Sequence, residues 1–166
     1  MALRHILAAN FVGLLCVGCA SLEGLRALIQ PPRFEQATDR ASEIRLLSVR
    51  SGGATARIWT NVTNPNPFGF TLSALQATLL IEDVEAADAD FPLGLPLQPH
   101  QTETIPLDLT ISFANAPRVA AAIQTAASGG GLHYRLEGTI GIDAGRFGQP
   151  TFGPMTIVSG DLRARF

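Results

Sequence analysis

Residues 105–113 alternate apolar and polar side chains, and this pattern restricts the fold more than any other segment does. The apolar positions are Ile105, Leu107, Leu109, Ile111 and Phe113. Successive side chains of a β-strand point to opposite faces of a sheet. The segment therefore predicts a strand with one face in a core and the other in solvent. Pro106 lies on the outward face, which predicts a sheet edge at the start of this strand.

The same period of two recurs through most of the chain after residue 42. It predicts strands over residues 44–49, 54–63, 70–83, 84–91, 132–142 and 155–166, with bulges near 73–74 and 159–160 and a proline-rich loop at 92–99. Residues 117–127 change to helical spacing: Asn115 is placed to cap a helix, Pro117 lies in its first turn, and glycines 129–131 end it. About seven strands with one inserted α-helix predict an all-β protein, an antiparallel β-sandwich.

The N-terminus has the order of a signal peptide. A short basic start with Arg4 is followed by an apolar stretch over residues 6–17, which is too short to span a bilayer as a helix. Small residues then lead to Cys19. The segment LCVGCAS around it resembles the lipobox of bacterial lipoproteins, although Cys16 stands where leucine is usual. We therefore expect a signal peptide over 1–18 and a bacterial lipoprotein.

The resemblance implies that Cys19 is lipidated and becomes the new N-terminus. Several acyl chains then give stable anchoring, because each buried methylene contributes about 0.8 kcal/mol. In such lipoproteins an aspartate after the cysteine often means retention in the inner membrane, so Ala20 implies the outer membrane, facing the periplasm. The only other cysteine, Cys16, would leave with the signal peptide. A redox CxxC site, a cysteine nucleophile and a Cys-ligated zinc site are then excluded in the mature chain.

The segment after Cys19 predicts a tether over residues 19–41, with the β-sandwich domain over 42–166. Two interpretations stay open for the tether: a short helix that Pro31 and Pro32 end, or a linker without regular structure. The mature chain would carry eleven arginines, no lysine and fourteen acids, a net charge of −3. This balance gives no electrostatic reason to bind nucleic acid.

Asn64, Pro65, Asn66, Pro67 and Phe68 form the densest local motif. Each asparagine precedes a proline and is therefore restricted to extended or turn conformations. Asparagine side chains in such positions bond nearby backbone groups, as in Asx turns. The motif predicts a rigid corner between two strands.

The stretch IWTNVTNPNPFGF, residues 58–70, resembles the LEA-2 group of late-embryogenesis-abundant proteins, which carry the WHy (water stress and hypersensitive response) domain. The resemblance continues through residues 95–113 and 130–143, and spans about 42–166. It implies a fibronectin III- or immunoglobulin-like sandwich with one helix. It also implies a role linked to dehydration, cold or membrane stress, without catalysis and without a cofactor.

Other clusters favour structural explanations. Glu82, Asp83, Glu85, Asp88 and Asp90 lie within nine residues, but the spacing lacks the glycine and final glutamate of an EF-hand. We interpret them as a solvated edge rather than a metal site. His100 and His133 are isolated, which argues against zinc or catalysis.

Trp59 faces outward on the alternation, between Arg57 and Asn61. An outward tryptophan beside an arginine can mark a binding surface. The alternative is that another part of the fold covers it.

Together, the resemblances to lipoproteins and to the LEA-2 group imply a non-enzymatic, membrane-anchored protein that protects the cell envelope during desiccation or related stress. The alternative is an envelope adaptor or ligand-binding lipoprotein that docks a protein partner or a lipid-like ligand.

Overall fold

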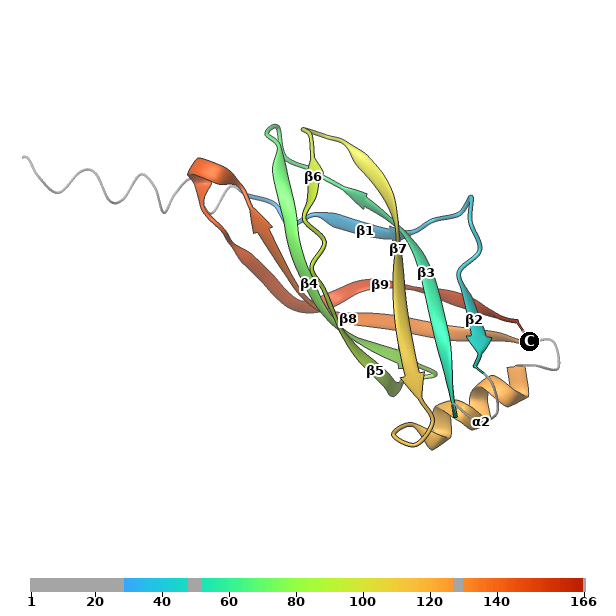
Figure 1. The fold of residues 1–166 in the computed structure, drawn as a ribbon. Helices are drawn as coiled ribbons and strands as arrows, with labels where there is room; N and C mark the ends of the chain where they lie inside the picture. Colours follow the sequence, from blue (N-terminus) through green and yellow to red (C-terminus); the bar gives the residue numbers. More distant parts are fainter. Residues whose placement is uncertain (1–28, 48–51, 127–129, 166) are drawn as a thin grey trace, which may run out of the picture.

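In the part of the chain that the structure describes, the regular structure is one sheet, one α-helix and a short 3-10 turn (Figure 1). The computed structural model describes residues 29–47, 52–126 and 130–165. Its elements are β1 (Arg33–Gln36), β2 (Glu43–Leu46), β3 (Gly53–Thr63), β4 (Phe70–Ile81), β5 (Val84–Phe91), β6 (Leu95–Leu97), β7 (Thr102–Ser112), α2 (Pro117–Ala126), β8 (Gly131–Asp143), the 3-10 turn η1 (Gly145–Phe147) and β9 (Thr151–Arg165).

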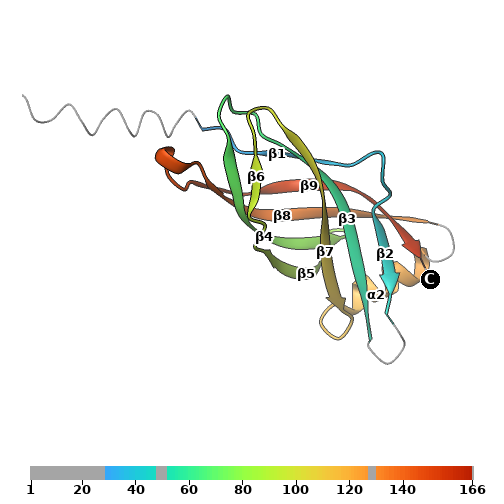
Figure 2. The same cartoon turned by 45° about the horizontal axis from the view of Figure 1, so that its top comes forward.

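The sheet has the strand order β1-β3-β2-β9-β8-β4-β5, with β6 added to β4 and β7 added to β3. β7 pairs with the whole of β3 on one side, while β1 and β2 share the other side of β3 in succession. β3 and β7 cross β8 and β9 in Figures 1 and 2. Among the described strands, β7 has no second neighbour, so the edge position predicted from Pro106 is confirmed.

One parallel pairing changes the predicted architecture. The all-β class is confirmed, and all strand pairs except one are antiparallel as predicted. β2 and β9 instead run parallel, with Ile44 opposite Ala164. This pairing joins the half containing β3 and β7 to the half containing β8 and β4. The described strands therefore form one mixed sheet of nine strands rather than an antiparallel sandwich of about seven.

The core contains the inward positions of four long strands, as the alternation predicts. The side chains of Ile58, Val62, Leu107, Ile111, Leu75, Leu79, Leu136 and Ile140 are all buried and belong to one cluster. The predicted bulge in β4 is confirmed, since the register with β8 shifts between Leu72 and Ala74. Leu72 and Leu75 are both buried because the bulge returns the strand to the core face.

Three local predictions are wrong. The sheet begins at Arg33 and not at 42, because Arg33–Gln36 pairs with the part of β3 that β2 leaves uncovered. The proline-rich loop contains β6, which pairs with β4. The register of β9 with β8 shifts at Ile157 and again between Phe152 and Met155, and not at 159–160. The signal segment, Cys19, Val49 and the predicted glycine stop at 129 lie outside the described residues.

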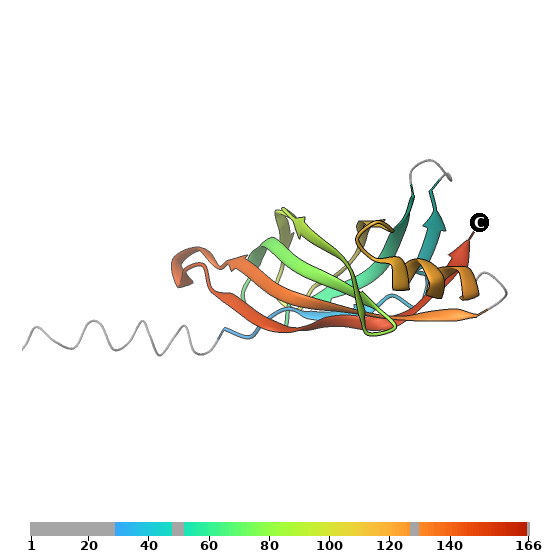
Figure 3. The ribbon, with the colours of Figure 1, turned by 90° about the horizontal axis from the view of Figure 1, so that it is seen from below.

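α2 packs on β5 and β8 at one end of the molecule (Figure 3). Its buried residues are Val119, Ile123 and Ala126, which recur at helical spacing. The helix begins at Pro117, so Ala116 rather than Asn115 occupies the position before its first residue. In Figure 1 the described chain begins with β1 far from this helix, towards the opposite end. None of the described helices is long and apolar enough to cross a membrane.

Gly138 marks a close approach of two strands in the middle of the sheet. It lies in β8 opposite Ala77 of β4. A Cβ atom at this position would lie 2.8 Å from the Cα of Ala77 and would clash with the carbonyl oxygen of Gln76. Backbone atoms of a central strand cannot move aside without disturbing the ladder, so this position requires glycine.

We expect Gly138→Ala to lower the free energy of unfolding by at least about 2 kcal/mol, because overpacking forces the backbone to shift. Gly141→Ala, in the same strand, is the control: its Cβ would come no nearer than 4.0 Å to the carbonyl oxygen of Ala74. Chemical denaturation of both variants measures the difference. Equal stability of the two would contradict the packing argument.

Tyr134 places a hydroxyl inside the core. The residue is fully buried, and its hydroxyl makes no hydrogen bond to the described residues. Burial raises the pKa of Tyr134 to about 12, and the nearby Ser42 side chain offsets only part of this effect. The unfolded chain titrates near the ordinary tyrosine pKa of about 10. Because the unfolded chain loses this proton first, the free energy of unfolding keeps its full value below about pH 10 and falls as pH rises through the folded pKa.

Tyr134→Phe is expected to be as stable as the wild type at neutral pH, or about 1 kcal/mol more stable, because it removes an unpaired buried hydroxyl. Its advantage should grow between about pH 10 and 12. Denaturation at several pH values tests this. Since Tyr134 is the only tyrosine of the chain, phenolate absorbance gives its pKa directly. A midpoint near pH 10 in the folded protein would contradict the burial argument.

Candidate functional site

Two buried asparagines organise the corner between β3 and β4. Asn64 and Asn66 are 0% and 1% exposed, which is unusual for polar side chains. Each is followed by a proline, so the backbone there is already restricted before any contact forms. Because an unpaired buried amide is costly, their hydrogen bonds determine whether this corner is stable.

The side chain of Asn64 is surrounded by backbone groups. Its Nδ2 donates to the carbonyl oxygens of Phe68 at 2.8 Å, Gln98 at 3.0 Å and Leu97 at 3.3 Å. Its Oδ1 accepts from the backbone N–H of Asn66 at 2.9 Å, which forms an Asx turn, and from Asn66 Nδ2 at 3.1 Å. One side chain thus joins the β3–β4 corner to the end of β6.

Asn66 holds the N-terminal part of the described chain. Its Oδ1 accepts from the backbone N–H of Gln30 and its Nδ2 donates to the carbonyl of Gln30, both at 2.9 Å. The amide therefore pairs with the backbone as a neighbouring strand would. The neighbouring Ile29 is buried in the core cluster. The sequence predicted a corner, and the structure adds this attachment of the chain that precedes β1.

Aromatic side chains cover the same end of the molecule. Phe68 lies 4.8 Å from Phe147 of η1 between ring centroids, and the two rings are tilted by 37°. The guanidinium carbon of Arg146 lies 5.0 Å from the centroid of the Phe147 ring. The corner formed by Asn64, Asn66, Phe68 and η1 is called the asparagine corner below.

Arg57 and Trp59 lie on the outward face of β3, but each has a partner. The Arg57 guanidinium pairs with both carboxylate oxygens of Asp108, at 2.7 and 2.8 Å. This hydrogen bonding holds the pKa of Asp108 below its usual range. Trp59 is partly exposed, with the guanidinium of Arg40 at 4.6 Å from its ring. The two residues therefore belong to separate contacts.

The outward face of β3 and β7 continues as a ladder of matched pairs. Asn61 accepts from the hydroxyl of Thr104 at 2.7 Å, and the hydroxyls of Thr63 and Thr102 lie 2.8 Å apart. Trp59 stands opposite Pro106 in the register. Cross-strand pairs of this kind stabilise a sheet.

The acidic residues of the β4–β5 hairpin are spread among different partners. Glu82 and Asp83 form the turn with φ values of 49° and 60°. Asp83 pairs with Arg135 at 2.9 Å, and Asp88 accepts from Thr78 at 2.6 Å. Within the described ranges, no three His, Cys, Asp or Glu side chains are arranged to hold a metal ion.

The histidines occupy unrelated places. His100 lies exposed in the turn before β7 with a φ of 57°, and His133 Nδ1 lies 3.6 Å from Asp161.

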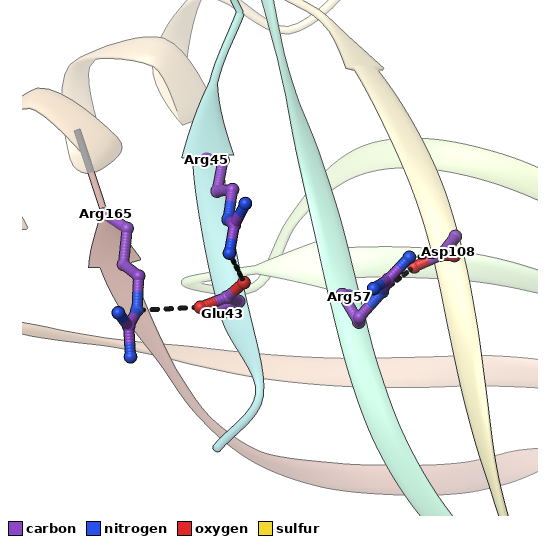
Figure 4. A network of polar contacts seen from close by, with 5 residues as sticks. All are labelled: Glu43, Arg45, Arg57, Asp108 and Arg165. Carbon is purple, nitrogen blue, oxygen red and sulfur yellow. Dashed lines mark hydrogen bonds and ion pairs between the residues drawn. The ribbon is translucent and has the colours of Figure 1, made fainter. Parts of the chain in front are cut away.

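Sequence reasoning missed a charge network on the outer face of β2, β3 and β9 (Figure 4). The carboxylate of Glu43 pairs with Arg45 at 2.5 Å and with Arg165 at 2.7 Å. Glu43 and Arg165 meet only because β2 runs parallel to β9. No local spacing indicates a contact between the first and last parts of a sheet.

We expect Asn64→Asp to lower the free energy of unfolding by about 3 kcal/mol or more at neutral pH, because a buried carboxylate would face three carbonyl oxygens without a donor. The difference in the free energy of unfolding from the wild type should become smaller at acid pH, because protonation of the new carboxylate restores one hydrogen-bond donor. Asn61→Asp is the matched control, since a carboxylate can accept the Thr104 hydrogen bond equally well. Denaturation at two pH values tests both. A small, pH-independent loss in Asn64→Asp would contradict this role of the amide.

Comparison with known proteins identifies a family whose model matches the part of the chain that contains the asparagine corner. A family model described as "late embryogenesis abundant protein", LEA_2, matches residues 60–156. No curated protein matches the chain.

Among solved structures, the solution structure of an Arabidopsis thaliana protein has a TM-score of 0.56 at 16% identity and covers 76% of this chain and 81% of its own. The crystal structure of an Archaeoglobus fulgidus protein has a TM-score of 0.45 at 15% identity and covers 76% and 98%. The Arabidopsis likeness shows a shared fold. The family match spans more than half of the chain and includes the asparagine corner, so the chain belongs to the late embryogenesis abundant family LEA_2.

Proposed function

We propose that this LEA_2 protein is a lipoprotein of the bacterial envelope that protects the membrane or neighbouring proteins during desiccation or osmotic stress. The observation that carries the proposal is the attachment of Gln30 by Asn66 at 2.9 Å in both directions. It gives the chain that leads from Cys19 a defined entry into the fold.

The distance between the lipid and this entry is short. Residues 20–28 separate Cys19 from Ile29. Ten extended steps span at most about 35 Å. In the proposed protein, the asparagine corner therefore stays within about one bilayer thickness of the membrane surface.

A protective role suits the polar surface of the domain. The outward face of β3 and β7 carries hydroxyl, amide and charged pairs, and Trp59 opposite Pro106 is the one apolar pair among them. Such a face binds water and resists association with unfolded neighbours. A lipid anchor would hold this polar face beside the bilayer, where loss of water disturbs the packing of the lipids.

A role without catalysis is supported by the family, which is generally non-enzymatic. The buried amides of Asn64 and Asn66 are also occupied, by backbone groups and by each other. Their hydrogen bonds hold the corner together and leave no reactive group directed at a substrate.

An envelope adaptor is the second candidate. Leu46 and Leu47, at the end of β2, are 36% and 37% exposed. Exposed leucines of this kind can contribute to a docking surface. Crosslinking that retrieves one stoichiometric envelope protein, and that is lost in Leu46→Ser with Leu47→Ser, would favour the adaptor over general protection.

The anchoring proposal is tested with Cys19→Ala and with Cys16→Ala as the matched control. We expect the wild type and Cys16→Ala to fractionate with membranes and to carry acyl chains on Cys19 in mass spectra of the N-terminus. Cys19→Ala should lack the lipid. Unmodified, soluble wild-type protein would overturn anchoring.

The protective role is tested by survival after drying and osmotic shock. A deletion strain should survive less well than its parent, and the wild-type gene should restore survival more fully than the Cys19→Ala gene. Equal survival of the deletion strain and its parent would overturn the protective role while leaving the anchoring result intact.

A further inference from the structure

Arginines gather on the outer face of four neighbouring strands. One row across β7, β3, β2 and β9 contains, in register, Asp108, Arg57, Glu43 and Arg163. The next row contains Thr110, Thr55, Arg45 and Arg165. Since residues two apart share a face of a strand, both rows point to the same side of the sheet.

This face carries more positive than negative charge. Its four arginines meet two carboxylates, and one of these, Glu43, is shared by Arg45 and Arg165 (Figure 4). The side chain of Glu43 is only 14% exposed, whereas those of Arg45 and Arg165 are 63% and 59% exposed. The acid therefore lies beneath the guanidinium groups, and the surplus charge faces solvent. The surplus is local, because the whole chain has a net charge of −2.

A depression of about 290 Å³ lies within this face. Its lining includes Arg45, Arg57, Thr55, Thr110, Glu43 and Asp108. Thr55 stands opposite both Arg45 and Thr110 in the register, so these three residues form one row across β2, β3 and β7, and Arg57 lies beside Thr55 in the next row. Among the described residues, neither threonine hydroxyl has a hydrogen-bond partner.

The arginines keep donors beyond those used in their ion pairs. Arg57 directs Nε and Nη2 at Asp108, and Arg45 directs Nη2 at Glu43. A guanidinium has five N–H donors, so Nη1 of both residues and Nε of Arg45 are left for another acceptor. Guanidinium forks and hydroxyls are the groups that bind tetrahedral oxyanions in proteins.

We propose that this depression binds a phosphoryl group, with Arg45 and Arg57 as the charged ligands and Thr55 and Thr110 as hydroxyl donors. A phosphoryl anion would neutralise the surplus charge and occupy the donors that the ion pairs leave unused. The ligand is a free phosphate monoester or inorganic phosphate, or the phosphate of a lipid headgroup. The site lies on the folded sheet and does not depend on the proposed lipid anchor.

The proposal is tested by calorimetric titration of the full chain, held in nonionic detergent, with inorganic phosphate. We expect saturable binding at one site. Arg45→Gln and Arg57→Gln should each weaken it about tenfold, because each removes a charge-assisted pair. Arg118→Gln, on the exposed surface of α2, makes the same change of charge elsewhere and should bind as the wild type does.

A second variant separates the site from general stability. Thr55→Val with Thr110→Val keeps the shape and strand preference of both side chains and replaces each hydroxyl by a methyl group. It should weaken phosphate binding while thermal unfolding stays close to that of the wild type. Unchanged phosphate affinity in this variant and in Arg57→Gln would overturn the proposal, as would absence of saturable binding in the wild type.

Vesicles identify the source of the phosphoryl group. Flotation is compared for vesicles of phosphatidylcholine alone and with phosphatidic acid added, using Cys19→Ala so that acyl chains do not contribute. Binding to phosphatidic acid that Arg45→Gln lowers and inorganic phosphate displaces would support the site with a lipid headgroup as ligand. Saturable binding of inorganic phosphate without vesicle binding would support it with a free phosphate.

Discussion

The hydrogen bonds of two buried side-chain amides hold one end of this molecule together. Asn64 supplies an acceptor for an Asx turn and a donor for three carbonyls, and Asn66 continues the arrangement to Gln30. Backbone groups in a corner between strands have no ladder to satisfy them, and burial without partners is costly. The amides provide these partners. β1, β3, β4 and β6 consequently meet at one place, and the chain before β1 has a fixed entry.

β3 connects this corner to the other surfaces. Its inward side chains, such as Ile58 and Val62, enter the core, while its outward ones form the ladder with β7. The other edge of β3 pairs with β1 and β2 in succession, and β2 in turn pairs with β9. The phosphoryl site proposed above and the asparagine corner are thus parts of one strand system. A disturbance of β3 would reach both, whereas substitution of a surface arginine would remain local.

Local patterns predicted the elements that satisfy local rules. Residues 54–63 and 105–112 lie in strands, and the inward positions Ile58, Val62, Leu107, Leu109 and Ile111 are buried as expected. Arg33–Gln36 contains one apolar residue and forms a strand only because an edge of β3 is available, which no local pattern indicates. The same holds for Asn66 with Gln30 and for Glu43 with Arg165, since both contacts depend on the register of distant segments. The sequence motif singled out the two asparagines but did not indicate the distant backbone groups, such as those of Gln30 and Leu97, to which they bond.

The parallel pairing of β2 with β9 has a consequence for how the chain acquires its structure. It connects Glu43 with Arg163, near the beginning and the end of the described chain. Contacts between such distant segments close large loops and slow the search for the native state. A polypeptide that emerges N-terminus first therefore exposes the edge of β2 until β9 has been synthesised. Pairing with β9 covers this edge, and a chain truncated before β9 would retain an unprotected edge prone to pairing with other chains.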